Sequence, residues 1–272
     1  MIEINKIYNM DCVTGMKMLP NDCIDLTVTS PPYDNLRTYN GFSWDFEATA
    51  KELYRVTKQG GVVVWVVGDA TVKGSETGTA FKQVLFFKEC GFNLHDTMIY
   101  EKHNPVPNAK TRYQQSFEYM FVLSKGKPKT ANILEEPRRN ECNDKRTYRK
   151  KKFTRDKSGE FAGARDYYIK ENVPRRNIWA YKIGLYNSTA DKIAFKHPAI
   201  FPERLVQDHI LSWSNDGGIV LDCFMGSGTT AKMALLNNRN FIGFEISEKY
   251  CEIANERIDN LLKEMESESD AE

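Results

Sequence analysis

Short apolar runs alternate with amphipathic stretches along most of the chain, and this pattern predicts strands that alternate with helices. The apolar runs predict strands at Ile4–Tyr8, Ile24–Thr29, Val62–Val67, Asn93–Lys102, Phe117–Leu123, Gly217–Asp222 and Phe241–Phe244. Helical spacing of apolar residues predicts helices at Val13–Leu19, Phe46–Thr57, Thr79–Cys90, Pro202–Trp213, Ala231–Leu236 and Glu248–Lys263. The chain is therefore expected to fold as an α/β domain.

Glycine-rich and polar stretches separate these elements. We expect Gly60-Gly61 to end the second helix and Gly68–Gly78 to form a mobile loop. The strands Asn93–Lys102 and Phe117–Leu123 are expected to form a long antiparallel pair at the edge of the sheet. The acidic tail, residues 264–272, is expected to be disordered.

The composition sets limits on the class of protein. The 272 residues, 41% of them hydrophobic, suffice for one large α/β domain with an insertion or for two small domains. Six cysteines lack C-x-x-C spacing and four histidines do not cluster with them, so neither a zinc site nor a disulfide framework is expected. The start of the chain does not resemble a signal peptide, and no apolar run reaches membrane length. These features predict a cytoplasmic protein without a membrane partner.

Positive charge gathers in one segment although the formal net charge is only +1. Residues 125–182 hold 18 Lys and Arg against 8 Asp and Glu, interleaved with aromatic residues that include Trp179 and Tyr181. A solvated loop is one interpretation. We favour a nucleic-acid surface, because cations neutralise phosphates and flat rings pack on bases. The basic residues singled out for DNA binding are Arg149, Lys150, Lys151, Lys152, Arg155, Arg175 and Arg176.

The turn Thr29-Ser30-Pro31-Pro32-Tyr33 is the candidate for the chemistry. It follows a buried strand, and the strand stops because neither proline can donate to a ladder. Two prolines offer carbonyls without N–H groups, and the Ser30 hydroxyl also accepts hydrogen bonds. Such a turn suits a ligand with an exocyclic amino group, on whose ring Tyr33 can stack. The alternative is that the prolines merely end the strand and Tyr33 packs in the core.

A second candidate site surrounds Gly226 and Gly228. The order strand, Gly-x-Gly loop, helix, strand and acid is that of βαβ units that bind the adenosine end of a cofactor. Glu245 lies where a carboxylate can accept both ribose hydroxyls. A third glycine and a Gly-Lys-Ser/Thr sequence are missing, which favours a cofactor without phosphates, such as S-adenosylmethionine. Asp11 follows the first strand and is either a helix N-cap or an acceptor for a ligand's amino group.

Together these stretches resemble the DNA methyltransferases that methylate exocyclic amines, N4 of cytosine or N6 of adenine. The matching pieces follow one order along the chain: Ile7–Cys12, Asp25–Tyr33, Gly60–Gly68, Tyr100–Lys125, His197–Pro202, Asp222–Thr230 and Phe241–Glu245. The catalytic turn precedes the cofactor loop, which is similar to the circularly permuted β-group of the family. The resemblance implies a doubly wound, mostly parallel sheet of seven strands, one of them reversed, with helices on both faces.

The resemblance also implies domain boundaries and residue roles. Residues 1–124 would form the catalytic half, 125–182 a basic target-recognition insertion, 183–263 the cofactor-binding half, and 264–272 the tail. Ser30, Pro31, Pro32 and Tyr33 would be catalytic. The cofactor-binding residues would be Asp11, Cys12, Thr29, His197, Pro198, Phe201, Asp222, Phe224, Gly226, Ser227, Gly228, Thr229, Thr230 and Glu245. No metal is implied.

Serine at the first position of the turn goes mostly with N4-cytosine in this family, so we expect methyl transfer from S-adenosylmethionine to a flipped-out cytosine in double-stranded DNA. Adenine N6 is the alternative substrate. No cysteine follows a proline, as a nucleophile for C5-cytosine methylation would. The resemblance leaves open a restriction–modification role with a cognate endonuclease, and a homodimer. Two other classes also stay open: a nucleic-acid-binding protein with an inactive cofactor site, and a nucleotide hydrolase.

Overall fold

The computed structural model describes residues 2–32, 44–104, 112–138, 150–167, 171–184 and 186–269. The chain divides into two compact units. Unit 1 comprises Met1–Asn132 and Asn177–Glu272, and unit 2 comprises Ile133–Arg176. Within the described ranges, no helix is both long and apolar enough to cross a membrane.

Unit 1 is built around one sheet, in which the described residues form eight strands in the order β1-β14-β13-β2-β3-β7-β6-β12. These strands are β1 (Lys6–Asn9), β2 (Ile24–Thr29), β3 (Thr57–Val67), β6 (Asn93–Lys102), β7 (Phe117–Ser124), β12 (Ile178–Tyr181), β13 (Ile219–Asp222) and β14 (Asn240–Glu245). Only β7 is reversed: it pairs antiparallel with both β3 and β6, while the other pairs are parallel. The expected mostly parallel α/β sheet with one reversed strand is confirmed, but it has eight strands rather than seven.

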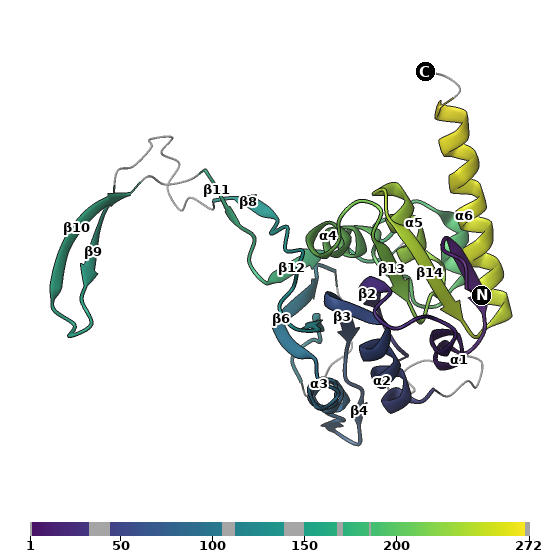
Figure 1. Ribbon diagram of the computed structural model, residues 1–272, viewed down its shortest axis with the longest axis horizontal. Helices are drawn as coiled ribbons and strands as arrows, with labels where there is room; N and C mark the ends of the chain where they lie inside the picture. The colour runs from purple at the N-terminus through teal and green to yellow at the C-terminus, as the bar shows by residue number, and fades with distance from the viewer. Residues whose placement is uncertain are drawn as a thin grey trace. The chain divides into compact units, whose positions relative to one another are not determined.

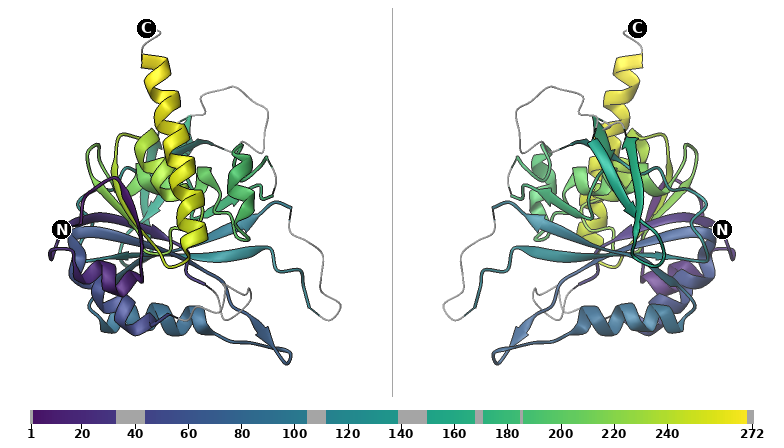
Figure 2. Two further views of the ribbon diagram at one scale, coloured as in Figure 1. Left: turned by 90° about the vertical axis from the view of Figure 1, so that its right-hand side faces the viewer. Right: turned by 90° about the vertical axis from the view of Figure 1, so that its left-hand side faces the viewer.

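Helices cover both faces of this sheet (Figures 1 and 2). On one side lie α1 (Cys12–Lys17), α2 (Phe46–Val56) and α3 (Thr79–Glu89). On the other lie α4 (Glu203–Trp213), α5 (Thr229–Leu236) and α6 (Glu248–Ser269), with the short 3₁₀ helix η1 (Lys192–Lys196) before α4. The sheet is therefore buried on both faces, which explains why its central strands read as continuous apolar runs.

The strand β3 shows how local sequence sets this core. Its run Val62–Val67 is β-branched apart from Trp65, and all six side chains are buried. The indole Nε1 of Trp65 donates to Gln83 Oε1 at 2.9 Å, so the largest buried side chain keeps its polar atom paired. The preceding helix α2 begins where Asp45 caps it by accepting from Ala48 N at 3.0 Å.

Several expected boundaries are wrong. Gly60-Gly61 does not end α2, which stops at Val56; the two glycines lie inside β3, at an irregularity in its pairing with β2. The stretch Gly68–Gly78 contains a two-stranded hairpin, β4 (Thr71–Val72) and β5 (Ser75–Glu76). The pair β6 and β7 is not at the edge of the sheet, because β12 pairs with β6 and forms the edge strand.

The acidic tail is also not disordered over its first part. Helix α6 continues to Ser269, well beyond Lys263. Glutamate and methionine are good helix formers, so a run of charge does not by itself end a helix. The last residues, 270–272, lie outside the described part.

The described residues of unit 2 form two antiparallel strand pairs. Strand β8 (Glu135–Pro137) pairs with β11 (Asn172–Pro174), and β9 (Lys150–Arg155) pairs with β10 (Phe161–Tyr167). In the turn between β9 and β10, Asp156 Oδ1 accepts from Ser158 N at 2.8 Å and from Glu160 N at 3.1 Å. The described residues of the basic segment therefore include short strands, while most of their side chains are exposed to solvent.

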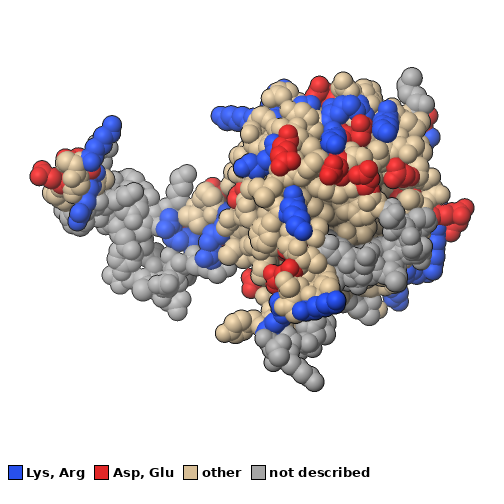
Figure 3. Space-filling model, turned by 90° about the horizontal axis from the view of Figure 1, so that it is seen from below, with Lys and Arg blue, Asp and Glu red and all other residues tan. Residues whose placement is uncertain are grey.

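Two aromatic residues expected on the nucleic-acid surface belong to unit 1 instead. Trp179 and Tyr181 lie in β12, and each is only 5% exposed. Trp179 packs on His209, and the Tyr181 hydroxyl donates to Asp208 at 2.6 Å. The expectation that these two residues lie on a DNA-binding surface is wrong, because their side chains are buried in the core of unit 1. Over the face of unit 1 seen in Figure 3, acidic and basic side chains are intermixed.

Candidate active site

A cavity of about 810 Å³ opens in unit 1 where the parallel strands end. Ligands of open α/β sheets bind at this carboxyl edge. The predicted site residues that line the cavity are Asp11, Cys12, Ser30, Pro32, His197, Pro198, Phe201, Asp222, Phe224, Gly226, Ser227, Thr229 and Glu245. Four predicted residues do not line it: Thr29, Pro31, Gly228 and Thr230. Tyr33 lies outside the described residues.

The catalytic turn begins at the end of β2, near the middle of the sheet. Thr29 is the last residue of the strand and is fully buried, whereas Ser30 and Pro32 border the cavity. Pro31 is buried behind them. The strand ends here because the prolines cannot donate to the neighbouring strands. The turn therefore presents a serine and a proline ring to any ligand in the cavity.

Asp222 connects this turn to the glycine loop. It stands at the end of β13, and its Oδ1 accepts from Thr29 Oγ1 at 2.6 Å. Its Oδ2 accepts from Thr230 Oγ1, also at 2.6 Å, and Phe224 N donates to Oδ1 at 3.0 Å. Burial raises the pKa of Asp222, and the threonine hydrogen bonds partly offset this. Through these hydrogen bonds, Asp222 connects the Ser30 turn to the loop that contains Gly226 and Gly228.

The loop after β13 needs glycine at two positions. Gly226 has φ +53°, and a Cβ there would lie 3.2 Å from the ring of His197. Gly228 has φ +81°, and a Cβ there would lie 3.1 Å from Ala254 on α6. Both the left-handed backbone and the close neighbours disfavour a side chain. Helix α5 starts directly after the loop, at Thr229.

Glu245 ends β14 beside the loop and is 8% exposed. Its Oε2 accepts from Gly226 N at 2.8 Å, and its Oε1 accepts from Ser247 N at 2.9 Å. Burial raises the pKa of Glu245, although the hydrogen bonds from Ser247 and Gly226 act in the opposite direction. The carboxylate also borders the cavity, where it can act as a hydrogen-bond acceptor toward a ligand.

Asp11 is a helix N-cap, one of the two roles expected from the sequence. Its Oδ1 accepts from Thr14 N at 2.9 Å and from the Thr14 hydroxyl at 3.1 Å, which makes it the N-cap of α1. Because both bonds use Oδ1 and the residue borders the cavity, a role toward a ligand is compatible with the cap. On the opposite wall, the His197 ring packs edge-on against Tyr250 with the ring centroids 4.4 Å apart.

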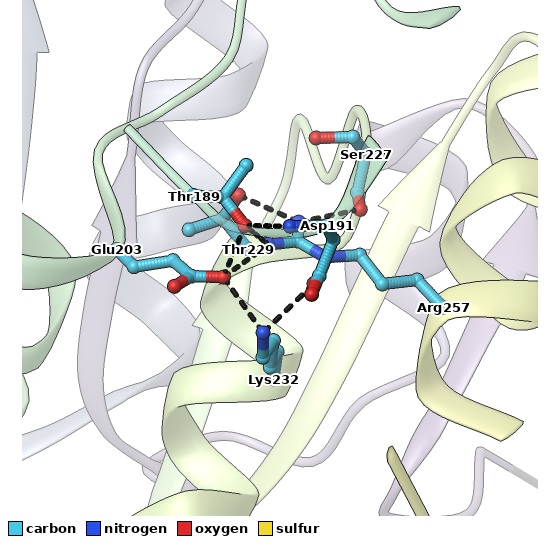
Figure 4. Close-up of polar contacts among 7 residues, drawn as sticks. All are labelled: Thr189, Asp191, Glu203, Ser227, Thr229, Lys232 and Arg257. Atoms are coloured by element: carbon cyan, nitrogen blue, oxygen red, sulfur yellow. Dashed lines mark hydrogen bonds and ion pairs between the residues drawn. The ribbon is translucent and has the colours of Figure 1, made fainter. Parts of the chain in front are cut away.

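A buried cluster of charges lies behind the loop, as Figure 4 shows. Arg257 of α6 is 1% exposed; its Nη1 donates to the Ser227 carbonyl and to Thr229 Oγ1, both at 3.0 Å. Its Nε lies 2.6 Å from Asp191 Oδ2 and its Nη2 lies 2.5 Å from Glu203 Oε1. Lys232 also forms ion pairs with both of these carboxylates. The cluster fastens α6, the segment before α4 and the cofactor loop to one another.

Sequence analysis missed this cluster, although one signal was present. Tyr250, Ala254, Ile258 and Leu261 form the buried face of α6, and Arg257 lies on that face. An arginine on an apolar helix face is almost never buried without partners. Sequence analysis also gave no role to Tyr100, Lys102 and Glu118, which line the cavity from β6 and β7, or to Trp44 beside Phe224.

The residues predicted to bind DNA fall mostly in unit 2. Arg149 lies outside the described residues. Lys150, Lys151 and Lys152 open strand β9, and Arg155 ends it. Arg175 and Arg176 follow β11, and Arg176 Nε lies 3.6 Å from Glu136 Oε1. These residues therefore share one small β-unit outside the sheet that carries the cavity.

This fold, with its glycine loop and a glutamate at the carboxyl edge of the sheet, is that of the S-adenosylmethionine-dependent methyltransferases. The sequence model of the N6/N4 methyltransferases, described as DNA methylase, matches residues 24–256. The orphan methyltransferase M.BamHII from Bacillus amyloliquefaciens is 60% identical over 248 residues, 91% of this chain and 93% of that protein. The chain therefore belongs to the DNA methylase family that methylates exocyclic amines.

Further likenesses extend over most of the chain. The type II methyltransferase M.SmaI from Serratia marcescens is 25% identical and covers 93% of this chain and 90% of that protein. The PvuII cytosine-N4-specific DNA methyltransferase structure has a TM-score of 0.66 at 20% identity, over 92% of this chain and 84% of that one. The M1.HpyAVI–SAM complex has a TM-score of 0.57 at 22% identity, over 93% and 98%. The cofactor of the family is S-adenosylmethionine.

Proposed function

We propose that this DNA methyltransferase methylates N4 of cytosine in double-stranded DNA. The observation that carries the proposal is the juxtaposition of two motifs on one cavity. The Ser30 turn and the glycine loop are held together by the Thr29–Asp222 hydrogen bond of 2.6 Å. A methyl donor at the loop and an amine at the turn would thus meet in the same space, and such positioning is a large part of catalysis.

The cavity fits S-adenosylmethionine in its chemistry. The Glu245 carboxylate borders the cavity and would accept hydrogen bonds from the two ribose hydroxyls, and Asp11 would accept from the adenine amino group. Phe224, Phe201 and His197 supply flat apolar walls, and Ser227 and Thr229 supply polar groups for the amino-acid end. When bound, S-adenosylmethionine supplies a sulfonium methyl group that an amine can displace in one step.

The turn would activate the amine. An exocyclic amine is a poor nucleophile because its lone pair is delocalised into the ring. The Ser30 hydroxyl at the cavity wall would accept one of its N–H groups and help to localise the lone pair toward the methyl donor. The second acceptor expected from the sequence, the Pro31 carbonyl, belongs to a residue that does not line the cavity. The base must leave the duplex to reach this pocket. Tyr33 is proposed to stack on it.

Two features favour cytosine over adenine. Serine occupies the first position of the turn, which in this family accompanies N4-cytosine methylation. The PvuII enzyme, whose structure resembles this one, is cytosine-N4-specific. The basic unit 2 is proposed to bind the DNA duplex, mainly by neutralising phosphates. M.BamHII is called an orphan methyltransferase, which favours action without a partner endonuclease.

Replacement Glu245→Gln is expected to weaken S-adenosylmethionine binding by about tenfold or more at pH 7, because charged hydrogen bonds of this kind contribute about 1.5–3 kcal/mol. Burial raises the pKa of Glu245 above its ordinary value of 4.5. Since the ionised carboxylate is the acceptor, affinity is full above that raised pKa and falls as the pH drops through it. Calorimetric titration between pH 7 and 4.5 measures both effects.

The matched control is Glu248→Gln, three residues further on. Glu248 is exposed at the first position of α6. We expect this variant to bind S-adenosylmethionine like the wild type at every pH. A Glu245→Gln variant that keeps the wild-type affinity, or keeps the same fall in acid, would contradict the ribose role.

The proposal is tested by nucleoside analysis. Purified protein is incubated with S-adenosylmethionine and unmethylated mixed-sequence duplex DNA, the DNA is digested, and methylated nucleosides are identified by mass spectrometry. N4-methylcytosine is the expected product. N6-methyladenine would keep fold, cofactor and site but refute the cytosine assignment, and the absence of both products with intact cofactor binding would refute this DNA as substrate.

A further inference from the structure

An ion pair lines the cavity on the side away from the glycine loop. Lys102 ends β6, Glu118 lies near the start of β7, and both border the same cavity as Ser30. The strand order places β13 and β14 on one side of β2, and β3, β7 and β6 on the other. The cavity thus has a cofactor side and, across Ser30, a second side whose described polar groups include Lys102 and Glu118.

This pair is partly withdrawn from water. The side chains of Lys102 and Glu118 are 24% and 17% exposed, and Lys102 Nζ contacts Glu118 Oε1 directly. Lys102 Nζ lies 5.8 Å from the centre of the Tyr100 ring, which also borders the cavity. Desolvating two charges costs about as much as their attraction returns, so such a pair is weak evidence for stability alone. Its placement in a ligand cavity points to a role in binding.

The spacing of the sheet defines what can fit between Ser30 and the pair. Glu118 lies on β7, two strands from β2, and neighbouring strands are about 4.8 Å apart, so the backbones of β2 and β7 are on the order of 10 Å apart. One base ring with a hydrogen bond at each end spans such a gap. Lys102 comes from the next strand and its long side chain brings Nζ to Glu118. The gap therefore suits a single nucleobase, with its amine at Ser30.

We propose that Lys102, held in place by Glu118, donates a hydrogen bond to the O2 and N3 edge of the flipped-out cytosine. Lysine carries only donors, and the cytosine edge next to the amine carries only acceptors, N3 and the O2 carbonyl. Adenine has N1 at the equivalent place but then a C–H group instead of a carbonyl. The pair would therefore help to select cytosine, and Glu118 would neutralise the lysine charge and fix its position.

This inference rests on the proposed cytosine methylation. The test compares the wild type with Lys102→Met, which keeps the length of the side chain and removes its donors. Initial rates of N4-methylcytosine and N6-methyladenine formation are measured on unmethylated mixed-sequence duplex DNA, with S-adenosylmethionine affinity measured by titration. We expect the N4-methylcytosine rate to fall by about 10- to 100-fold, the usual range for loss of a base-reading contact. The S-adenosylmethionine affinity should stay within about twofold, and the proportion of N6-methyladenine should rise.

Two further variants separate recognition from structure. Lys102→Arg keeps a donor and the pair with Glu118, and is expected to recover at least part of the rate. Lys58→Met removes the lysine of a comparable pair, Lys58–Asp25 at 2.7 Å, at the opposite end of the strands. This control is expected to methylate DNA like the wild type. Thermal unfolding of every variant is recorded alongside.

The outcomes distinguish this inference from the function on which it rests. A wild type that forms only N6-methyladenine refutes the cytosine assignment and this role of Lys102 together. A wild type that forms N4-methylcytosine, with Lys102→Met equally active, refutes only the role of Lys102. A Lys102→Met variant whose cofactor affinity falls as much as its rate, or a Lys102→Arg variant as inactive as Lys102→Met, also refutes it, because the lysine would then act through the fold.

Discussion

Replacement Ser30→Ala is expected to lower the rate of DNA methylation by about 100-fold or more, the usual magnitude when a positioned proton acceptor is removed. The replacement removes a single hydroxyl group at the cavity wall, and the Thr29–Asp222 hydrogen bond next to it stays intact. The S-adenosylmethionine affinity is therefore expected to remain within about twofold. Single-turnover kinetics and a cofactor titration measure the two quantities separately.

The control for this variant is Thr27→Val in the same strand. Thr27 is fully buried, and its Oγ1 has no hydrogen-bond partner among the described residues. Valine has nearly the same shape, so the variant is expected to keep full activity and to be at least as stable as the wild type. If Ser30→Ala lost cofactor affinity and turnover equally, the hydroxyl would be part of the cofactor site rather than of the amine site.

The fold was largely predictable where local signals and tertiary structure agree. Strand Ile24–Thr29 and strand Asn93–Lys102 have the bounds that their apolar runs predicted. Helix α2 is one residue shorter than expected and begins at its Asp45 cap. In each case a strong period coincides with a clear stop signal.

The errors arise where tertiary contacts override local preference. The Gly60-Gly61 pair was expected to end a helix, yet both glycines lie in β3. Gly60 N donates to Lys125 O at 2.7 Å, so hydrogen bonds to a distant segment hold this backbone in the strand. Strand β12 was hidden in a basic segment, and only its parallel pairing with β6 identifies it. The change in composition therefore indicated a separate segment at residues 125–182, but that segment includes β12, which belongs to the main sheet of unit 1.

The same distinction applies to the site. Ser30, Asp222, Gly226 and Glu245 line the cavity, as the sequence predicted. They could be identified because short sequence motifs mark the turn, the glycine loop and the strand ends. Detailed roles could not be identified in this way: Thr230, expected at the cofactor, supports Asp222 from behind. Arg257 and the Lys102–Glu118 pair act across distant segments, so only the folded chain brings them together.

Replacement Arg257→Met is expected to lower the free energy of unfolding by about 3–5 kcal/mol, the usual cost of removing one partner from a buried ion pair. Arg257 is 1% exposed and binds the carboxylates of Asp191 and Glu203. Without it, Lys232 would be the one cation among the described residues that pairs with these two groups, and the Ser227 carbonyl would lose a donor. Denaturant unfolding measures the loss.

The acid limb of the stability curve gives an independent check on the same cluster. Burial alone would raise the pKa of Asp191, but hydrogen bonds from Lys232 and Arg257 outweigh it and hold the pKa below the ordinary 3.8. A lowered pKa means that this stabilisation is present above pH 3.8 and is lost as the pH falls through the folded-state pKa. Arg257→Met is therefore expected to flatten the fall of stability in acid.

The control is Lys6→Met, which removes an ion pair of a different kind. Lys6 and Glu3 are 56% and 64% exposed, so their pair is expected to contribute less than about 1 kcal/mol. If Arg257→Met unfolded at nearly the same denaturant concentration as Lys6→Met, the cluster would not stabilise the loop. The variant could instead unfold at a lower denaturant concentration and also bind S-adenosylmethionine more weakly. That result would show that the charge cluster stabilises the conformation of the glycine loop, because Arg257 donates hydrogen bonds to both Ser227 and Thr229.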